Sequence, residues 1–134
     1  MKVLVVPDVH GSHEWESVKD MPTDSYDFIV FMGDYFDSWE NQWPDQGNNF
    51  KSICSFIRED RTHRKLLLGN HDWSYLSKTK NGSGVSGHQI DKIEEIRNLL
   101  TENHDILMPD FHEPGLNRCI KFYGMLKNSG LLII

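Results

Sequence analysis

Residues 26–37 read YDFIVFMGDYFD and set the architecture expected for the chain. A short apolar run without alternation is typical of a strand buried on both faces, as in a parallel sheet. The run stops at Gly33, and two carboxylates, Asp34 and Asp37, follow at once. Because ligands of open α/β sheets bind at the carboxyl ends of the strands, this arrangement predicts a functional loop.

The same arrangement occurs at two other places. Residues 2–6 (KVLVV) predict a strand followed by Asp8 and His10, and residues 64–68 (RKLLL) predict a strand followed by GNHD at 69–72. The gaps between these runs exceed the dozen or so residues that a crossover connection needs. Three such units predict an α/β fold, a mainly parallel β-sheet flanked by helices.

The intervening segments carry helical patterns. Four apolar side chains repeat at helical spacing after Pro44, and residues 89–103 form the clearest helical pattern of the chain. Shorter helices are expected at 13–19 and 72–77. The apolar stripe consists of Phe50, Ile53, Cys54 and Ile57, and further strands are expected at 105–108, 119–123 and 131–134.

Composition bounds the class of protein. A length of 134 residues fits one domain, residues 1–134. The net charge of −6 argues against a nucleic-acid partner, because phosphate backbones favour a basic face. Apolar runs are far shorter than the roughly 20 residues of a membrane span, and the run at 3–6 is too short for a signal peptide. The two cysteines form no CxxC pair, so we expect a reducing, cytoplasmic location.

The three polar clusters should converge at one edge of the sheet, since parallel strands end side by side. Carboxylates held so close repel one another, and a bound cation relieves that repulsion. Carboxylate, imidazole and amide ligands together suit Mn²⁺, Fe²⁺ or Zn²⁺. The glycines before Asp34 and Asn70 should let the backbones approach closely. Each cluster alone is commonly an ordinary loop; the ordered set of three predicts a metal site.

Asp8-x-His10, Gly33-Asp34-x-x-Asp37 and Gly69-Asn70-His71-Asp72 resemble the first three motifs of the calcineurin-like metallophosphoesterases. The likeness covers residues 2–108, the N-terminal portion of the family pattern, and leaves 109–134 as a divergent or truncated tail. It implies a metallophosphoesterase-like sandwich, incomplete at its C-terminal side, around two divalent metal ions.

The resemblance also implies roles for individual residues. Asp8 and His10 would bind the first metal, Asp34 would bridge the two metals, and Asn70 would bind the second. His71 would face the substrate as a general acid, with Asp37 or Asp72 orienting its ring. A hydroxide activated by the two metals would then attack a phosphate ester. The alternative is a weakly active or non-catalytic binding module of the same fold with a partial metal site.

Departures from the family pattern narrow the expectation. Ser38 and Trp39 stand where the protein phosphatases of this group have Arg-Gly, and the third motif ends in Asp72 where theirs ends in Glu. The sequence therefore resembles a bacterial or phage-like small phosphoesterase more than a eukaryotic protein phosphatase. Trp39 and Trp43 are expected to wall the pocket, and Trp73 is expected to pack against the sheet.

The later ligand motifs of the family have no recognisable counterpart. His88 lies in a partial match, and His104, His112 or a partner chain are the remaining sources of late ligands. The apolar run at 131–134 would leave an exposed sheet edge, so we expect self-association, most simply as a homodimer. The expected partner is a phosphate-ester substrate, with no membrane association.

Overall fold

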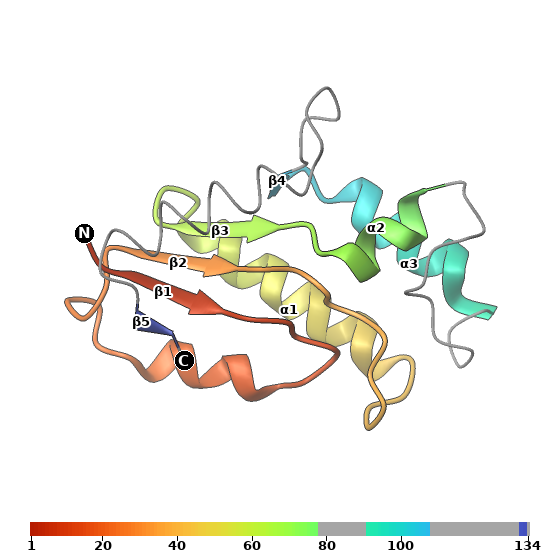
Figure 1. The fold of residues 1–134 in the computed structure, drawn as a ribbon, viewed down its shortest axis with the longest axis horizontal. Helices are drawn as coiled ribbons and strands as arrows, with labels where there is room; N and C mark the ends of the chain where they lie inside the picture. The colour runs from red at the N-terminus through yellow and green to blue at the C-terminus, as the bar shows by residue number, and fades with distance from the viewer. Residues whose placement is uncertain (78–90, 108–131, 134) are drawn as a thin grey trace.

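A five-stranded sheet forms the centre of the computed structural model, which describes residues 1–77, 91–107 and 132–133 (Figure 1). Every neighbouring pair of strands is parallel. This confirms the predicted α/β class. The strand order is β4-β3-β2-β1-β5, with β1 at Val3–Val6, β2 at Phe28–Phe31, β3 at Arg64–Leu67, β4 at Ile106–Leu107 and β5 at Leu132–Ile133.

The register of the central strands places the polar loops together. Val6 at the end of β1 lies opposite Phe31 at the end of β2. Phe31 in turn lies opposite Leu66 of β3. The chain therefore leaves β1, β2 and β3 at the same edge of the sheet, as expected from their sequence pattern.

The helices differ from the expectation mainly at their ends. The stripe predicted after Pro44 is buried on α1 (Asp45–Glu59). The first short helix, η1 (Glu14–Asp20), is a 3-10 helix, a form common in pieces too short for a stable α-helix. The third motif opens α2 (Asn70–Leu76). The late helix α3 (Ile93–Glu102) begins after the predicted Gln89; residues 78–90, like the strand expected at 119–123, lie outside the described part.

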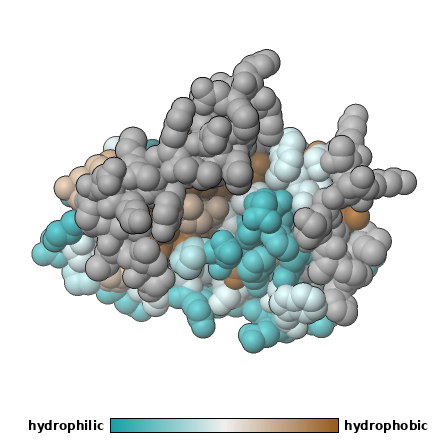
Figure 2. Space-filling model, in the orientation of Figure 1, coloured by the Kyte–Doolittle hydropathy of each residue, from teal (hydrophilic) through white to brown (hydrophobic). Residues whose placement is uncertain are grey.

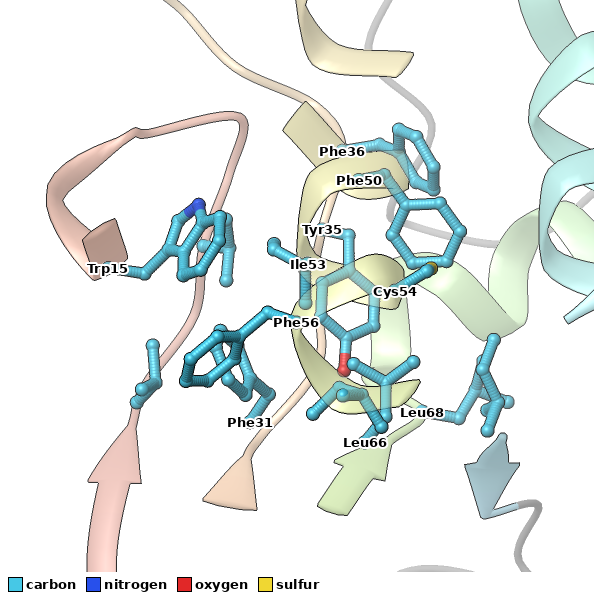
Figure 3. Close-up of a cluster of buried hydrophobic side chains, with 14 of the residues drawn as sticks. Trp15, Phe31, Tyr35, Phe36, Phe50, Ile53, Cys54, Phe56, Leu66 and Leu68 are labelled. Carbon is cyan, nitrogen blue, oxygen red and sulfur yellow. The ribbon is translucent and has the colours of Figure 1, made fainter. Parts of the chain in front are cut away.

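The main core lies between the sheet and the helices. Leu4, Ile29 and Leu66 point from the strands into one cluster that includes buried side chains of every described helix. Figure 3 shows its aromatic centre, where the ring centroid of Trp15 lies 5.6 Å from that of Phe31. Burial of each large side chain contributes about 1.5–3 kcal/mol, so this cluster fixes how the helices sit against the site edge.

The other face of the sheet carries a second, smaller cluster. Val3, Val5 and Val30 are buried there, with Phe28 and Met32 packed against them. Figure 2, viewed from this side, shows hydrophobic surface over the strands and hydrophilic surface beyond their carboxyl ends. The expected terminal strand forms β5 and pairs in parallel with β1. The homodimer stays a prediction.

None of the helices in the described part of the chain combines the length and apolar character needed to cross a bilayer.

Candidate metal centre

Backbone hydrogen bonds join the loop after β1 to the loop after β2. The N–H of His10 donates to the carbonyl oxygen of Asp34 at 2.7 Å, and that of Gly11 donates to the carbonyl of Tyr35 at 3.0 Å. The ladder between the two strands thus continues past their ends. It holds His10 beside Asp34 without help from either side chain.

Two glycines let the loop after β2 meet the loop after β3. A Cβ atom on Gly33 would lie 2.1 Å from the backbone nitrogen of Gly69, and a Cβ on Gly69 would lie 2.1 Å from Oδ1 of Asp34. Gly33 also has a φ of +106°, a conformation that side chains disfavour. The close approach expected at the glycines is confirmed.

The carboxylate of Asp72 links the same two loops by hydrogen bonds. Its Oδ2 accepts the N–H groups of Asp34 at 2.7 Å and Gly69 at 2.9 Å, and its Oδ1 accepts that of Tyr35 at 2.9 Å. The side chain is fully buried, and burial raises its pKa to about 6 in spite of these hydrogen bonds. Asp72 therefore holds backbone groups, which is a structural contact with the site.

Asp37 is the carboxylate that contacts the ring of His71. Nδ1 of His71 lies 3.0 Å from Oδ2 of Asp37, and the hydroxyl of Tyr75 donates to Oδ1. Burial raises the pKa of Tyr75, so its hydroxyl stays protonated and remains a donor. Since the carboxylate accepts at Nδ1, the ring of His71 keeps a proton there, and Nε2 is the atom it can present to the site.

His10 is oriented by a similar contact. Its Nδ1 lies 2.9 Å from the carbonyl oxygen of Phe36, which can only accept, so Nδ1 carries the proton. Nε2 is then the nitrogen with a lone pair for a metal ion. A ring nitrogen bonded to a carbonyl while the other binds metal is the usual arrangement of metal-binding histidines.

Among the described residues, three side chains form a group that could hold a metal ion: His10, Asp34 and His71. Each offers an atom, and these atoms all lie within 4.8 Å of one another. Asp34 is 4% exposed, and burial raises its pKa, so a cation beside it would relieve the cost of its charge. Imidazole and carboxylate ligands in this arrangement fit a borderline divalent metal.

The other predicted ligands lie on the same loops. Asp8 is exposed, and its negative charge adds to the burial that raises the pKa of Asp34. Asn70 is exposed at the first position of α2. His71 stands within the ligand group although the resemblance assigned it to the substrate.

Three residues of these loops have left-handed backbones. The φ angles are +42° at His10, +52° at Asp34 and +65° at Asp37. Such conformations cost about 1–3 kcal/mol each and persist where surrounding contacts enforce them, typically at functional sites. Two of the three are aspartates, which tolerate this region better than most residues.

Tyr75 is the site residue that the sequence analysis missed. It lies four residues after His71 on α2, and residues at this spacing share one face of a helix. That spacing was the available signal. Its hydroxyl contact completes a chain from Tyr75 through Asp37 to His71.

The late histidines and the tryptophans lie in different environments. His104 is exposed, and His88 and His112 lie outside the described residues. Trp43 packs against Phe36, with ring centroids 6.5 Å apart, and its expected place in the wall of the pocket stays a prediction. Trp73 on α2 is 39% exposed, and its expected packing against the sheet stays a prediction.

Comparison with known proteins identifies a family relationship. A family model described as Calcineurin-like phosphoesterase matches residues 1–127, which extends past the motifs quoted above. Searches against curated proteins and against solved structures give no significant match.

Proposed function

The chain belongs to the calcineurin-like phosphoesterase family, and from this premise we propose that it hydrolyses a phosphate ester with divalent metal ions. The proposed ligands are Asp8, His10, Asp34 and Asn70. The observation that carries the proposal is the close approach of two of these ligands, His10 and Asp34, whose ligand atoms lie within 4.8 Å of each other and of the ring of His71.

The chain's own residues prepare the site for such ions. Bound metals of the Mn²⁺, Fe²⁺ or Zn²⁺ type supply charge to the phosphate and lower the pKa of a water toward 7. His10 has its ring fixed by the Phe36 carbonyl, so no rotation is needed on binding. Asp34 accepts the backbone N–H of His71 at Oδ1, 2.8 Å away, and this hydrogen bond would hold the carboxylate in place for an ion.

His71 is proposed to give a proton to the leaving oxygen from Nε2. The carboxylate of Asp37 favours the doubly protonated ring, because it accepts from Nδ1 and carries the opposite charge. Tyr75 keeps that carboxylate oriented. A general acid contributes about 10²–10⁴-fold to the rate, and most for leaving groups that are strong bases.

Two variants separate the roles. Asp34→Asn should lose metal and activity together, because this carboxylate would serve both ions. His71→Gln should retain metal and lose turnover, more with phenyl phosphate than with p-nitrophenyl phosphate, whose leaving group needs little protonation. Hydrolysis of p-nitrophenyl phosphate and its bis-ester is measured with Mn²⁺ and after EDTA, with the remote exposed change Asp24→Asn as control.

A second candidate is a binding module that holds one ion and turns over weakly or not at all. The observation that favours it is the place of His71 in the ligand group, which would give one ion three protein ligands. Metal stoichiometry decides between the two. If His71→Gln strips the metal, His71 is a ligand and the general-acid assignment is wrong.

A further inference from the structure

The helix that carries His71 is held at its far end by a residue of another helix. α2 and α3 pack against one another (Figure 1). Nε of Arg97, on α3, donates to the backbone carbonyl oxygen of Tyr75 at 2.9 Å. Tyr75 lies in the last turn of α2, where carbonyl groups have no donor within the helix. Arg97 therefore supplies a hydrogen bond that α2 cannot make by itself.

Charge favours this contact. The carboxyl end of a helix carries a partial negative charge, which a nearby cation stabilises. α2 has no basic side chain in its own last turn, so the guanidinium of Arg97 supplies the positive charge from α3. Nη1 of Arg97 also pairs with Glu94, three residues earlier on α3. The guanidinium thus has a partner on each helix, and it links the two.

Tyr75 connects this contact to the proposed general acid. Its side chain is fully buried, and its ring packs against that of Phe36 with the centroids 6.2 Å apart. The carbonyl of Tyr75 accepts from Arg97, and its hydroxyl donates to Oδ1 of Asp37. Because a ring in a close-packed core has little freedom, a shift of its backbone carries the hydroxyl with it. The contact at the carbonyl therefore acts on Asp37, whose Oδ2 lies 3.0 Å from Nδ1 of His71.

The carboxylate of Asp37 needs support of this kind. Asp37 lies in the loop after β2, outside any helix or strand, so side-chain contacts must fix its position. Proton transfer requires the acid to lie within hydrogen-bond reach of the leaving oxygen. A misplacement of 1 Å, even from a change far from the chemistry, can cost about 100-fold in rate. Small shifts at the end of α2 are thus expected to reach the reaction through Asp37.

We propose that Arg97 is a positioning residue for the general acid His71, and that it acts through the hydroxyl of Tyr75. This inference rests on the proposed function and adds to it a determinant of substrate choice. Esters of weakly acidic alcohols and phenols need a well-placed acid, whereas esters of acidic phenols hardly need one. Loss of Arg97 should therefore narrow the range of substrates toward good leaving groups.

Hydrolysis of two esters by the Mn²⁺-loaded protein measures this role. The readout is the kcat for p-nitrophenyl phosphate divided by the kcat for phenyl phosphate, which rises when the acid is misplaced. Arg97→Gln should raise this ratio about fivefold, within the usual scale for contacts remote from a site. KM and Mn²⁺ affinity should stay as they are, because the proposed metal ligands keep their contacts. Arg97→Lys should raise the ratio less, because a cation remains near the end of α2.

Lys92→Gln is the matched control. It removes a second cation of the α3 segment, whose partners Asp91 and Glu95 belong to the same segment. The ratio should not change in this variant. The ratio is also independent of how much protein is folded, because unfolded protein hydrolyses neither ester. A purely structural role of Arg97 would lower both kcat values alike and leave the ratio unchanged, which would overturn the proposal.

A double-mutant cycle tests the route through Tyr75. Tyr75→Phe keeps the ring and removes the hydroxyl, so it should raise the ratio at least as much as Arg97→Gln does. In the Tyr75→Phe protein, Arg97→Gln should add less than about twofold, because two changes on one route are not additive. Equal effects of Arg97→Gln in the two backgrounds would show that this route is wrong.

The His71→Gln protein separates this inference from the proposed function. If His71→Gln raises the ratio and Arg97→Gln does not, Arg97 has no positioning role and the proposed general acid stands. If His71→Gln leaves the ratio unchanged, the general-acid role fails and the role of Arg97 fails with it. If the wild-type protein hydrolyses neither ester, the proposed function itself is wrong.

Discussion

The two junctions between the site loops are built in different ways. The junction between the loops after β1 and β2 is a continued backbone ladder, from Val9 to Gly33, His10 to Asp34 and Gly11 to Tyr35. The junction between the loops after β2 and β3 depends on two missing side chains, at Gly33 and Gly69, and on the Asp72 carboxylate. We call them the ladder junction and the carboxylate junction.

The difference indicates where single changes can damage the site. A ladder of backbone groups has few side chains whose removal breaks it. The carboxylate junction concentrates three N–H contacts on one buried acid and packs backbone against backbone. Since Asp34 belongs to both junctions, damage at the second is expected to reach the proposed bridging ligand.

Gly33→Ala should have the largest effect. The new Cβ would lie 2.1 Å from the backbone nitrogen of Gly69, and the residue would keep a φ of +106°. Neither atom can move as a flexible side chain would, so we expect a loss of about 4 kcal/mol or more in the free energy of unfolding. Urea unfolding measures it.

Gly47→Ala is the matched control for that change. The added Cβ there meets the far end of the Trp43 ring, 2.8 Å away, in a helix that alanine favours. A side chain can shift, so the loss should stay below about 1 kcal/mol. Equal losses at the two glycines would contradict the special status of the carboxylate junction.

Asp72→Ala should come next. It removes the acceptor of three N–H groups in a fully buried position, and unsatisfied buried groups cost about 1–3 kcal/mol each, with partial relaxation. We expect a loss of about 3 kcal/mol and weaker Mn²⁺ binding, measured by urea unfolding and by thermal shift with metal. Asp72→Asn keeps one acceptor oxygen and should lose less. Unchanged metal affinity in Asp72→Ala would show that the brace does not support Asp34.

The carboxylate junction should also titrate. The pKa of Asp72 is raised to about 6, and that of Asp34 is raised as well, both chiefly by burial. A raised pKa means that the folded state holds the proton more tightly than the unfolded chain, so stability falls as pH rises from about 4 through 6. In EDTA the loss for Asp72 should be on the order of 1–2 kcal/mol.

Unfolding of the metal-free protein and of Asp72→Asn across this pH range checks the slope. The difference between the two curves isolates Asp72 from the exposed acids, whose effects cancel. Mn²⁺ should flatten the slope of the wild-type protein, because a cation favours the ionised carboxylates. If the free energy of unfolding depends on pH in the same way in both proteins, Asp72 is not the source of the pH dependence.

The ladder junction could be predicted from the sequence, whereas the carboxylate junction could be predicted only in part. Apolar runs ending in glycine and acid fixed the sheet edge, and convergence of His10 and Asp34 followed from parallel pairing. The glycine contacts followed from the same pattern. The local sequence does not distinguish an aspartate that orients a histidine ring from one that accepts backbone N–H groups. Asp37 and Asp72 therefore remained alternatives for the residue that orients His71.

The tryptophans show the same limit. Trp39 and Trp43 are the same residue type in the same loop. Trp39 is nevertheless 84% exposed, whereas Trp43 packs against Phe36. Between them, Asn41 accepts a hydrogen bond from Gln46 and donates one to the carbonyl oxygen of Gly11, a residue far away in the sequence. Long-range partners of this kind are set by the folded backbone and not by periodicity.

Tyr35→Phe should have the smallest effect. It tests the hydrogen bond by which Tyr35, next to Asp34 in the carboxylate junction, contacts β3. The hydroxyl of Tyr35 donates to the carbonyl oxygen of Leu67 at 2.6 Å, and Figure 3 shows it on the side of Leu66 and Leu68. Phenylalanine keeps the ring and removes one hydrogen bond. Because Leu67 is half-buried, water can partly replace the donor, and we expect a loss of about 1 kcal/mol.

Tyr26→Phe is the control, since no hydroxyl hydrogen bond of Tyr26 is present among the described residues. Urea unfolding of both variants at pH 7 gives the comparison. Mn²⁺ affinity should be unchanged in Tyr35→Phe, because the Asp72 contacts that hold the Asp34 backbone remain. A loss of metal affinity as large as that of Asp72→Ala would mean that β3 itself, through Leu67, positions Asp34, and that the buried carboxylate is a secondary support.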